Sequence, residues 1–163
     1  MKKTIFAAFA LFLVAGPAEA ACTDPAQPKV NWRRCYFDAG ELHGVDLSGA
    51  ELRDTTFSRA TLKDAVLADA DAYRAKFVSA VLSGAKLDRA RLIEADFTRA
   101  ELDGASLREA DLRNAKLVGA SLKRADFTGA KLAGADFRHA DLTGATWIDG
   151  KKICAENSIG QCN

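Results

Sequence analysis

The residues best suited to chemistry in this sequence are its cysteines and histidines. The four cysteines are Cys22, Cys35, Cys154 and Cys162. Thiolates and imidazoles bind zinc when they are closely spaced, but neither cysteine pair has the spacing of a zinc knuckle, and His43 and His139 lie at unrelated positions. We therefore expect no metal site and interpret the cysteines as disulfide partners.

Other reactive arrangements are missing from the sequence. It contains no Ser/His/Asp set, no isolated carboxylate pair and no Gly-rich phosphate loop, and its Asp and Glu residues recur periodically, as solvated surface groups do. We expect no catalytic residues, no cofactor and no enzymatic activity. The 163 residues carry a formal net charge of +1, which argues against a strongly basic nucleic-acid binder.

The first twenty residues predict export. Lys2 and Lys3 precede an apolar run from Ile5 to Ala15, and Ala18-Glu19-Ala20 has the small-x-small pattern of a cleavage site. The run is too short to span a bilayer. We expect residues 1–20 to be a cleaved signal peptide and the mature chain to be periplasmic or secreted from a bacterium.

Two alternatives for this segment stay open. The run could remain as an uncleaved interfacial anchor, or Cys22 could be lipidated, because Ala20-Ala21-Cys22 ends as a lipid-attachment box does. Glu19 stands where such boxes usually carry Leu, and lipidation of Cys22 would leave Cys35 as an odd thiol in an oxidising compartment.

From Cys35 onward, a large apolar residue recurs every five positions for 23 units. Leu or Phe fills all these centres except Ala72 and Trp147, and Ala stands two residues before most of them. A step of five smears the centres around an α-helix and alternates them between the faces of a flat strand. The chain must therefore turn once per unit, which predicts a solenoid of short strands and turns.

Outward charges indicate how many units make one coil. At a separation of 20 residues, twelve charged pairs are opposite in sign and one, Glu51 with Asp71, is alike; at 15 residues, five are opposite and twelve alike. Stacked charges should alternate, so four units make a coil. Phe37, Phe57, Phe77, Phe97 and Phe137 then share one column, which is interrupted by Leu117.

Twenty-three units give about 5.75 coils, a rod roughly 28 Å long at the strand spacing. Both ends of such a rod need covers, because open edges template further stacking. The cysteines lie beyond the first and last centres, so pairing within each end needs the least reach. We predict a Cys22–Cys35 bond and a Cys154–Cys162 bond.

The unit, as in Ala95-Asp96-Phe97-Thr98-Arg99 and Ala140-Asp141-Leu142-Thr143-Gly144, resembles that of the pentapeptide-repeat family. The resemblance covers residues 35–149 and implies an all-β fold, a right-handed quadrilateral β-helix. We expect a signal peptide at 1–20, an N-terminal cap at 21–34, the β-helix at 35–149 and a C-terminal cap at 150–163.

The best-known members of that family protect DNA gyrase by imitating DNA with an acidic face. This chain departs from them in its predicted export and in the bases that interrupt its acidic columns, so gyrase protection is the weakest functional alternative. The interrupting bases are Lys76, Arg91, Lys116 and Lys131.

One irregularity suggests a binding surface. Ala72 replaces a large centre and is followed by the outward Tyr73, and Val78, Ile93 and Val118 also point outward on two neighbouring sides. Together these residues could form an apolar strip for a protein partner; alternatively, they are scattered surface residues and Ala72 leaves a small void.

We expect a non-enzymatic, exported structural or protein-binding solenoid without a membrane span. The alternatives are an architectural protein without a specific partner and an inhibitor or protector of an envelope enzyme.

Overall fold

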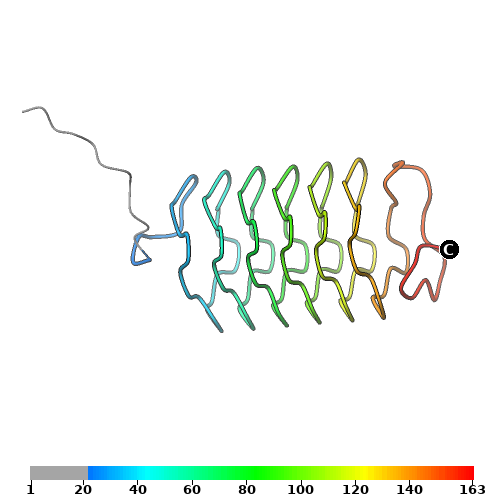
Figure 1. Ribbon diagram of the computed structural model, residues 1–163, viewed down its shortest axis with the longest axis horizontal. Coiled ribbons are helices and arrows are strands. Elements are labelled where there is room, and N and C mark those ends of the chain that lie inside the picture. Colours follow the sequence, from blue (N-terminus) through cyan, green and yellow to red (C-terminus); the bar gives the residue numbers. More distant parts are fainter. Residues whose placement is uncertain (1–21) are drawn as a thin grey trace, which may run out of the picture.

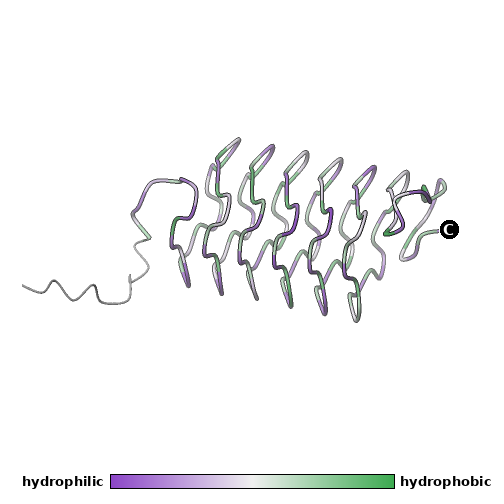
Figure 2. Cartoon of the chain, turned by 90° about the horizontal axis from the view of Figure 1, so that it is seen from above, coloured by the Kyte–Doolittle hydropathy of each residue, from purple (hydrophilic) through white to green (hydrophobic). Residues whose placement is uncertain are grey.

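The computed structural model describes residues 22–163, which form a rod of stacked laps with the first described residues at one end and the C-terminus at the other (Figure 1). The predicted signal peptide, residues 1–20, lies outside the described residues. Hydrophilic and hydrophobic residues alternate along every lap (Figure 2). The rod therefore has its interior and its surface defined within each five-residue unit.

Parallel bridges join residues twenty positions apart, from Asn31 with Glu51 to Asp126 with Thr146. Each strand is a single bridged residue that recurs every fifth position from 31 to 146, and residues 22–163 contain no helix. In a typical rung, the Leu92 N–H donates to the Asp111 carbonyl at 2.8 Å. Twenty residues thus complete one four-sided lap, the period that the charge pattern predicts.

Each corner is a tight turn that follows a core residue. The Ala50 N–H donates to the Leu47 carbonyl at 3.0 Å, and the residue before Ala50, Gly49, has a φ of 64°. A bond from residue i to i+3 with a positive φ at i+2 is the pattern of a type II turn. Non-glycine residues such as Arg59 and Glu94 adopt the same positive φ at other corners. Stacking on neighbouring laps must offset this local strain, which costs on the order of 1 kcal/mol per residue.

The interior is a narrow shaft of small and large apolar side chains. Ala95 and Leu92, like their equivalents in the central laps, are completely buried. Thr55 replaces Ala at one such position, and its hydroxyl donates to the Trp32 carbonyl at 2.5 Å. This buried polar side chain therefore has its hydrogen bond.

One side of the shaft is an aromatic column. The rings of Phe37, Phe57, Phe77 and Phe97 stack with successive centroid distances of 5.6, 5.2 and 4.8 Å. In the next lap Leu117 interrupts the column, and the aromatic ring of that lap is Phe127, ten residues later on the opposite side. Each of the first five laps from Phe37 therefore contains one aromatic centre, which keeps the interior volume nearly constant.

The lap that contains Ala72 is the exception to this constant volume. Ala72 is completely buried at a position where the laps on either side place Leu52 and Leu92. The other three centres of that lap are one Phe and two Leu, as in neighbouring laps. No larger side chain in the lap therefore makes up for the volume that a Leu in place of Ala72 would fill.

Near the N-terminal end of the rod, Trp32 is 2% exposed and packs against Phe37 with a centroid distance of 4.2 Å. Its indole N–H donates to the Asp24 carbonyl at 3.2 Å. The sulfur atoms of Cys22 and Cys35 lie 1.96 Å apart, which is disulfide distance. The parallel register already begins at Asn31, which bridges to Glu51, four residues before the predicted start of the β-helix.

The C-terminal end reverses direction. The chain after Trp147 forms antiparallel bridges, Ile153 with Thr146 and Ile159 with Asp141, so it lies across two sides of the last lap. The sulfur atoms of Cys154 and Cys162 lie 2.07 Å apart. This reversal ends the parallel register.

Because Phe127 supplies the aromatic ring of the lap in which Leu117 interrupts the column, substitutions at these two positions should compensate for each other. Leu117→Phe should overfill its lap and Phe127→Leu should leave a cavity, so each single variant should lose roughly 1–3 kcal/mol of unfolding free energy. The double variant restores one aromatic centre to the lap and should lose less than the sum of the two. Urea denaturation measures all four proteins; strictly additive losses would show that the two positions do not share a volume limit.

The two cysteine pairs predict the mass of the exported protein. Intact-mass spectrometry without reduction should show a chain that begins at Ala21 and lacks the hydrogens of four thiols. Each closed loop should contribute roughly 2–3 kcal/mol to stability, so reduction should lower the melting temperature. A lipid mass on Cys22, or free thiols in the exported protein, would contradict this prediction.

Candidate binding surface

Aspartate recurs at the bridged position because it satisfies a specific backbone group. The N–H of the residue after a core centre has no carbonyl partner within the solenoid. Where the residue two positions earlier is Asp, its carboxylate accepts this hydrogen bond, as Asp96 does from the Thr98 N–H at 2.9 Å. The aspartates with this contact include Asp46, Asp71, Asp96, Asp111, Asp126, Asp136 and Asp141.

Ion pairs on the surface follow three separations. Some join equivalent positions of successive laps, such as Arg89 with Asp69 at 2.7 Å. Others run diagonally, 18 residues apart, or stay within one unit, as the pair of Arg113 with Asp111 at 2.7 Å does. The vertical columns predicted from the sequence therefore account for only part of the pairing.

These contacts shift carboxyl titration. The hydrogen bond from Arg89 lowers the pKa of Asp69, and those from Arg113 and Arg138 lower the pKa values of Asp111 and Asp136. The arginine side chains are exposed and the carboxylates at least partly so, which means that water and salt screen each pair. A single pair therefore contributes little to stability, and only the pairs along the whole rod together contribute appreciably.

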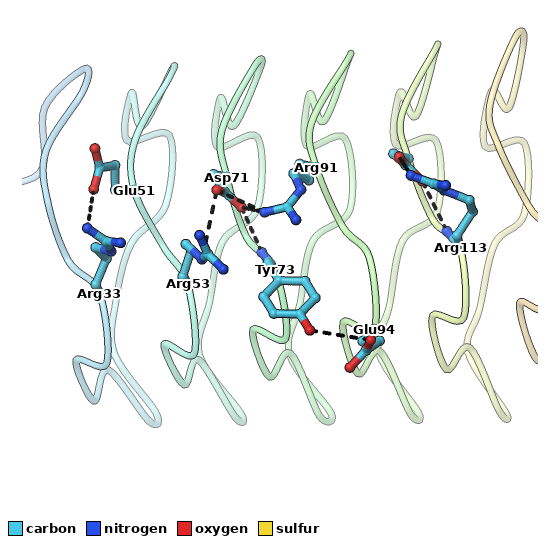
Figure 3. Close-up of polar contacts among 9 residues, drawn as sticks. Arg33, Glu51, Arg53, Asp71, Tyr73, Arg91, Glu94 and Arg113 are labelled. Atoms are coloured by element: carbon cyan, nitrogen blue, oxygen red, sulfur yellow. Dashed lines mark hydrogen bonds and ion pairs between the residues drawn. The ribbon is translucent and has the colours of Figure 1, made fainter.

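The most connected surface cluster surrounds Tyr73 (Figure 3). The guanidinium carbons of Arg53 and Arg91 lie 5.1 and 4.9 Å from the centre of its ring, distances at which cations attract an aromatic face. Asp71 lies between these two bases, 4.0 Å from Arg53 and 3.0 Å from Arg91, and accepts the Tyr73 N–H. The tyrosine is therefore held in a charged network instead of a plain apolar strip.

The edge of the Tyr73 ring also has charged neighbours. The Tyr73 hydroxyl lies 3.4 Å from a Glu94 carboxylate oxygen, and Arg74, 6.0 Å from the ring centre, pairs with Asp54 at 3.5 Å. We call Arg53, Asp71, Tyr73, Arg91 and Glu94 the Tyr73 cluster.

The four residues predicted as a partner surface occupy two columns. Tyr73 and Ile93 are equivalent residues of successive laps, and Ile93 is partly exposed. Val78 and Val118 lie on the next side, two laps apart, with Thr98 between them. The structure thus brings Tyr73 and Ile93 together but leaves the two valines as separate partly exposed residues.

A shallow groove that the sequence analysis missed runs beside the cluster, with a volume of about 280 Å³. Its walls bring together cations and anions of two adjoining sides: Tyr36, Asp54, Thr56, Arg74, Lys76, Glu94, Asp96 and Lys116. Tyr36 is 79% exposed at its N-terminal end. The twenty-residue register, applied to polar positions on either side of a corner, could have identified this groove from the sequence.

Within residues 22–163, no three His, Cys, Asp or Glu side chains gather closely enough to hold a metal ion. His43 and His139 are both exposed. The described residues also include no helix of the length and apolarity that crossing a bilayer requires.

Sequence comparison identifies the repeat. The model of a family described as pentapeptide repeats matches residues 41–77, 75–114 and 105–144. Among curated protein sequences, none matches this chain.

Solved structures with similar chains include three repeat proteins. HetL, a pentapeptide repeat protein involved in heterocyst differentiation regulation from the cyanobacterium Nostoc sp. strain PCC 7120, is 28% identical, with 78% of this chain and 73% of HetL covered and a TM-score of 0.41. A trypsin-treated form of QnrB1, a plasmid-mediated fluoroquinolone resistance protein, is 26% identical, with 72% and 63% covered and a TM-score of 0.45. Rfr23 from the cyanobacterium Cyanothece 51142 is 24% identical, with 68% and 86% covered and a TM-score of 0.38.

The lowered carboxyl pKa values predict acid sensitivity. A carboxyl whose pKa is lower in the folded chain stabilises the fold above its unfolded pKa, and that contribution is lost as the pH falls through the folded value. The melting temperature should therefore change little between about pH 8 and 5 and fall below about pH 4.

A matched variant tests the cause of this acid sensitivity. Replacing Asp111 and Asp136 by Asn keeps an acceptor for the N–H groups of Arg113 and Arg138 but removes two titrating groups, so the acid decline should become shallower. Thermal unfolding followed by circular dichroism measures both proteins. An identical decline in the variant would exclude these carboxyls as its source.

Proposed function

The chain belongs to the pentapeptide-repeat family, and on that premise we propose that it is an exported, non-enzymatic solenoid with a structural or protein-binding role. We also propose that the chain winds as a right-handed β-helix over residues 35–149, with about 5.75 laps separated by the strand spacing. Residues 21–34 and 150–163 would cap its two ends.

The filled core is the observation that carries the proposal. Within residues 22–163, buried Leu, Phe and Ala occupy the shaft lap after lap, so apart from the atoms missing at Ala72 its side chains leave little space to bind and orient a small substrate. The polar side chains that could do chemistry lie on open, flat sides, where water keeps charged groups near their ordinary reactivity. Binding to another macromolecule uses such a surface better than catalysis does.

Export is supported by the two ends of the chain. The signal-like segment at 1–20 precedes a fold in which two cysteine pairs lie at disulfide distance, one beside each end of the shaft. Disulfides persist in oxidising compartments such as the periplasm and the cell exterior. They would protect the terminal laps, each of which has a neighbouring lap on one side only.

The Tyr73 cluster supports a protein partner. Tyr and Arg are enriched among the residues that contribute most to protein interfaces, and here one tyrosine lies among three arginine side chains. The ring and the guanidinium groups are already positioned by Asp71 and Glu94, so docking would cost little side-chain entropy. The same arginines disfavour the anionic surface that imitation of DNA requires.

Photo-crosslinking in intact cells tests this function. A photoreactive residue placed at Thr98, beside the cluster on the next side, should join the exported protein to a defined partner protein that mass spectrometry identifies. Tyr73→Ser with Ile93→Ser should reduce the yield about tenfold, the loss expected when one interface anchor is removed. The melting temperature should stay nearly unchanged, because both side chains are partly exposed.

Val66→Ser with Val81→Ser is the matched control, since these partly exposed valines lie on the other two sides of the rod. The control should keep the crosslink of the unmodified protein. Equal yields in both variants would remove the Tyr73 cluster as the binding surface, and recovery of the protein with residues 1–20 attached in the cytoplasm would contradict export.

A further inference from the structure

The four sides of the rod differ in charge. We define the basic half as the two adjoining sides whose core columns contain Leu52 and Phe57, and the acidic half as the two sides whose core columns contain Leu62 and Leu67. Between residues 31 and 149, the basic half carries twelve Lys and Arg against eight Asp and Glu. The acidic half carries six Lys and Arg against eleven Asp and Glu. The rod therefore has opposite net charges on opposite flanks, although the whole chain is almost neutral.

Ion pairing within the rod does not cancel the excess on the basic half. Six of its bases form no ion pair within 4.0 Å among residues 22–163: Arg34, Arg59, Lys76, Arg99, Lys116 and Lys131. Only three of its acids, Asp38, Glu94 and Asp96, are likewise without a basic partner at that distance in the described chain. The bases are spread over the laps from one end to the other.

The acidic half shows the reverse imbalance. Among residues 22–163, its acids without an ion pair within 4.0 Å include Glu41, Asp64, Glu101 and Asp103 on one side. On the other side they include Asp46, Asp88, Glu109 and Asp149. The corresponding bases are three, Lys63, Lys86 and Arg124.

A second copy of this rod fits these flanks because its charges have the same axial period. Charged positions recur once per lap on every side, so two parallel or antiparallel rods side by side keep their rungs matched along their whole length. A partner with another fold has no reason to share this spacing. Contact between two basic halves or two acidic halves would place like charges together, which disfavours pairs in which both copies contribute the same half.

We propose that copies of this chain associate side by side, with the basic half of one rod against the acidic half of the next. Such a contact joins different surfaces of the two copies and leaves one free flank on each, so it continues into open rows instead of closing as a dimer. Mostly exposed charges hold it together, and salt should therefore weaken it. The proposal concerns contacts between copies and does not depend on export or on another partner.

Sedimentation velocity of the exported protein tests this association. At about 0.1 mM protein and about 20 mM salt, the weight-average mass should rise to about twice that of one chain or more, and about 500 mM salt should return it to one chain. A chain that stays monomeric at low salt, or an association that salt does not reverse, would overturn the proposal.

Charge reversal then identifies the contacting flanks. Arg59→Glu, Lys76→Glu and Arg99→Glu together make the basic half acidic, and Asp88→Lys, Glu101→Lys and Glu109→Lys together make the acidic half basic. Glu at positions 59 and 99 is compatible with the corner geometry, because Glu94 and Glu109 already adopt the same positive φ. Each variant alone should remain monomeric at low salt, and circular dichroism should show an unchanged fold.

The mixture of the two variants is the decisive sample, because one is acidic on both flanks and the other basic on both. Mixing should restore association in low salt to within about tenfold of the unmodified protein's affinity. No association in the mixture would contradict the proposed pairing. Unmodified protein that stays monomeric alone but sediments with anionic lipid vesicles would assign the basic half to a membrane surface instead, and would also overturn it.

Discussion

The narrow shaft is the constraint on which the rest of this structure depends. Each five-residue unit can turn one large and one small apolar side chain inward, and four such units must close around the axis before the chain returns above itself. Leu92 and Ala95 are completely buried by this arrangement, as are their equivalents above and below. A unit of another length would move every following core residue out of the shaft, which explains the uninterrupted period.

The same constraint fixes the surface as a lattice. Once a lap contains twenty residues, every outward side chain has neighbours at separations of 2, 18 and 20, and the observed ion pairs use all three. Asp96 and its equivalents serve the backbone as well, because they accept the N–H that the solenoid leaves without a carbonyl. The neighbours of each surface side chain are therefore set by the geometry of the core. The outward residues of one side can differ, and with them the function, without a change in the shaft.

Much of this architecture could be predicted from the sequence because each unit repeats the same choice between inside and outside. The alternation of charges at twenty residues indicated the lap that the bridge from Asp71 to Arg91 confirms. The arrangement around Tyr73 could not be predicted in the same way, since its position was known but the conformations of its arginine neighbours were not. Asp71 lies between Arg53 and Arg91, and only coordinates show that it contacts both.

The central claim is that the backbone hydrogen bonds connect each lap to the next at a fixed separation. NMR couplings transmitted through hydrogen bonds measure this directly on the isotope-labelled protein. The Leu92 amide nitrogen should couple to the carbonyl carbon of Asp111, whose oxygen lies 2.8 Å from it, and the Phe97 amide nitrogen to that of Lys116, at 2.7 Å. Couplings from these amides to residues one unit nearer or farther along the chain would contradict the four-sided lap and the surface built on it.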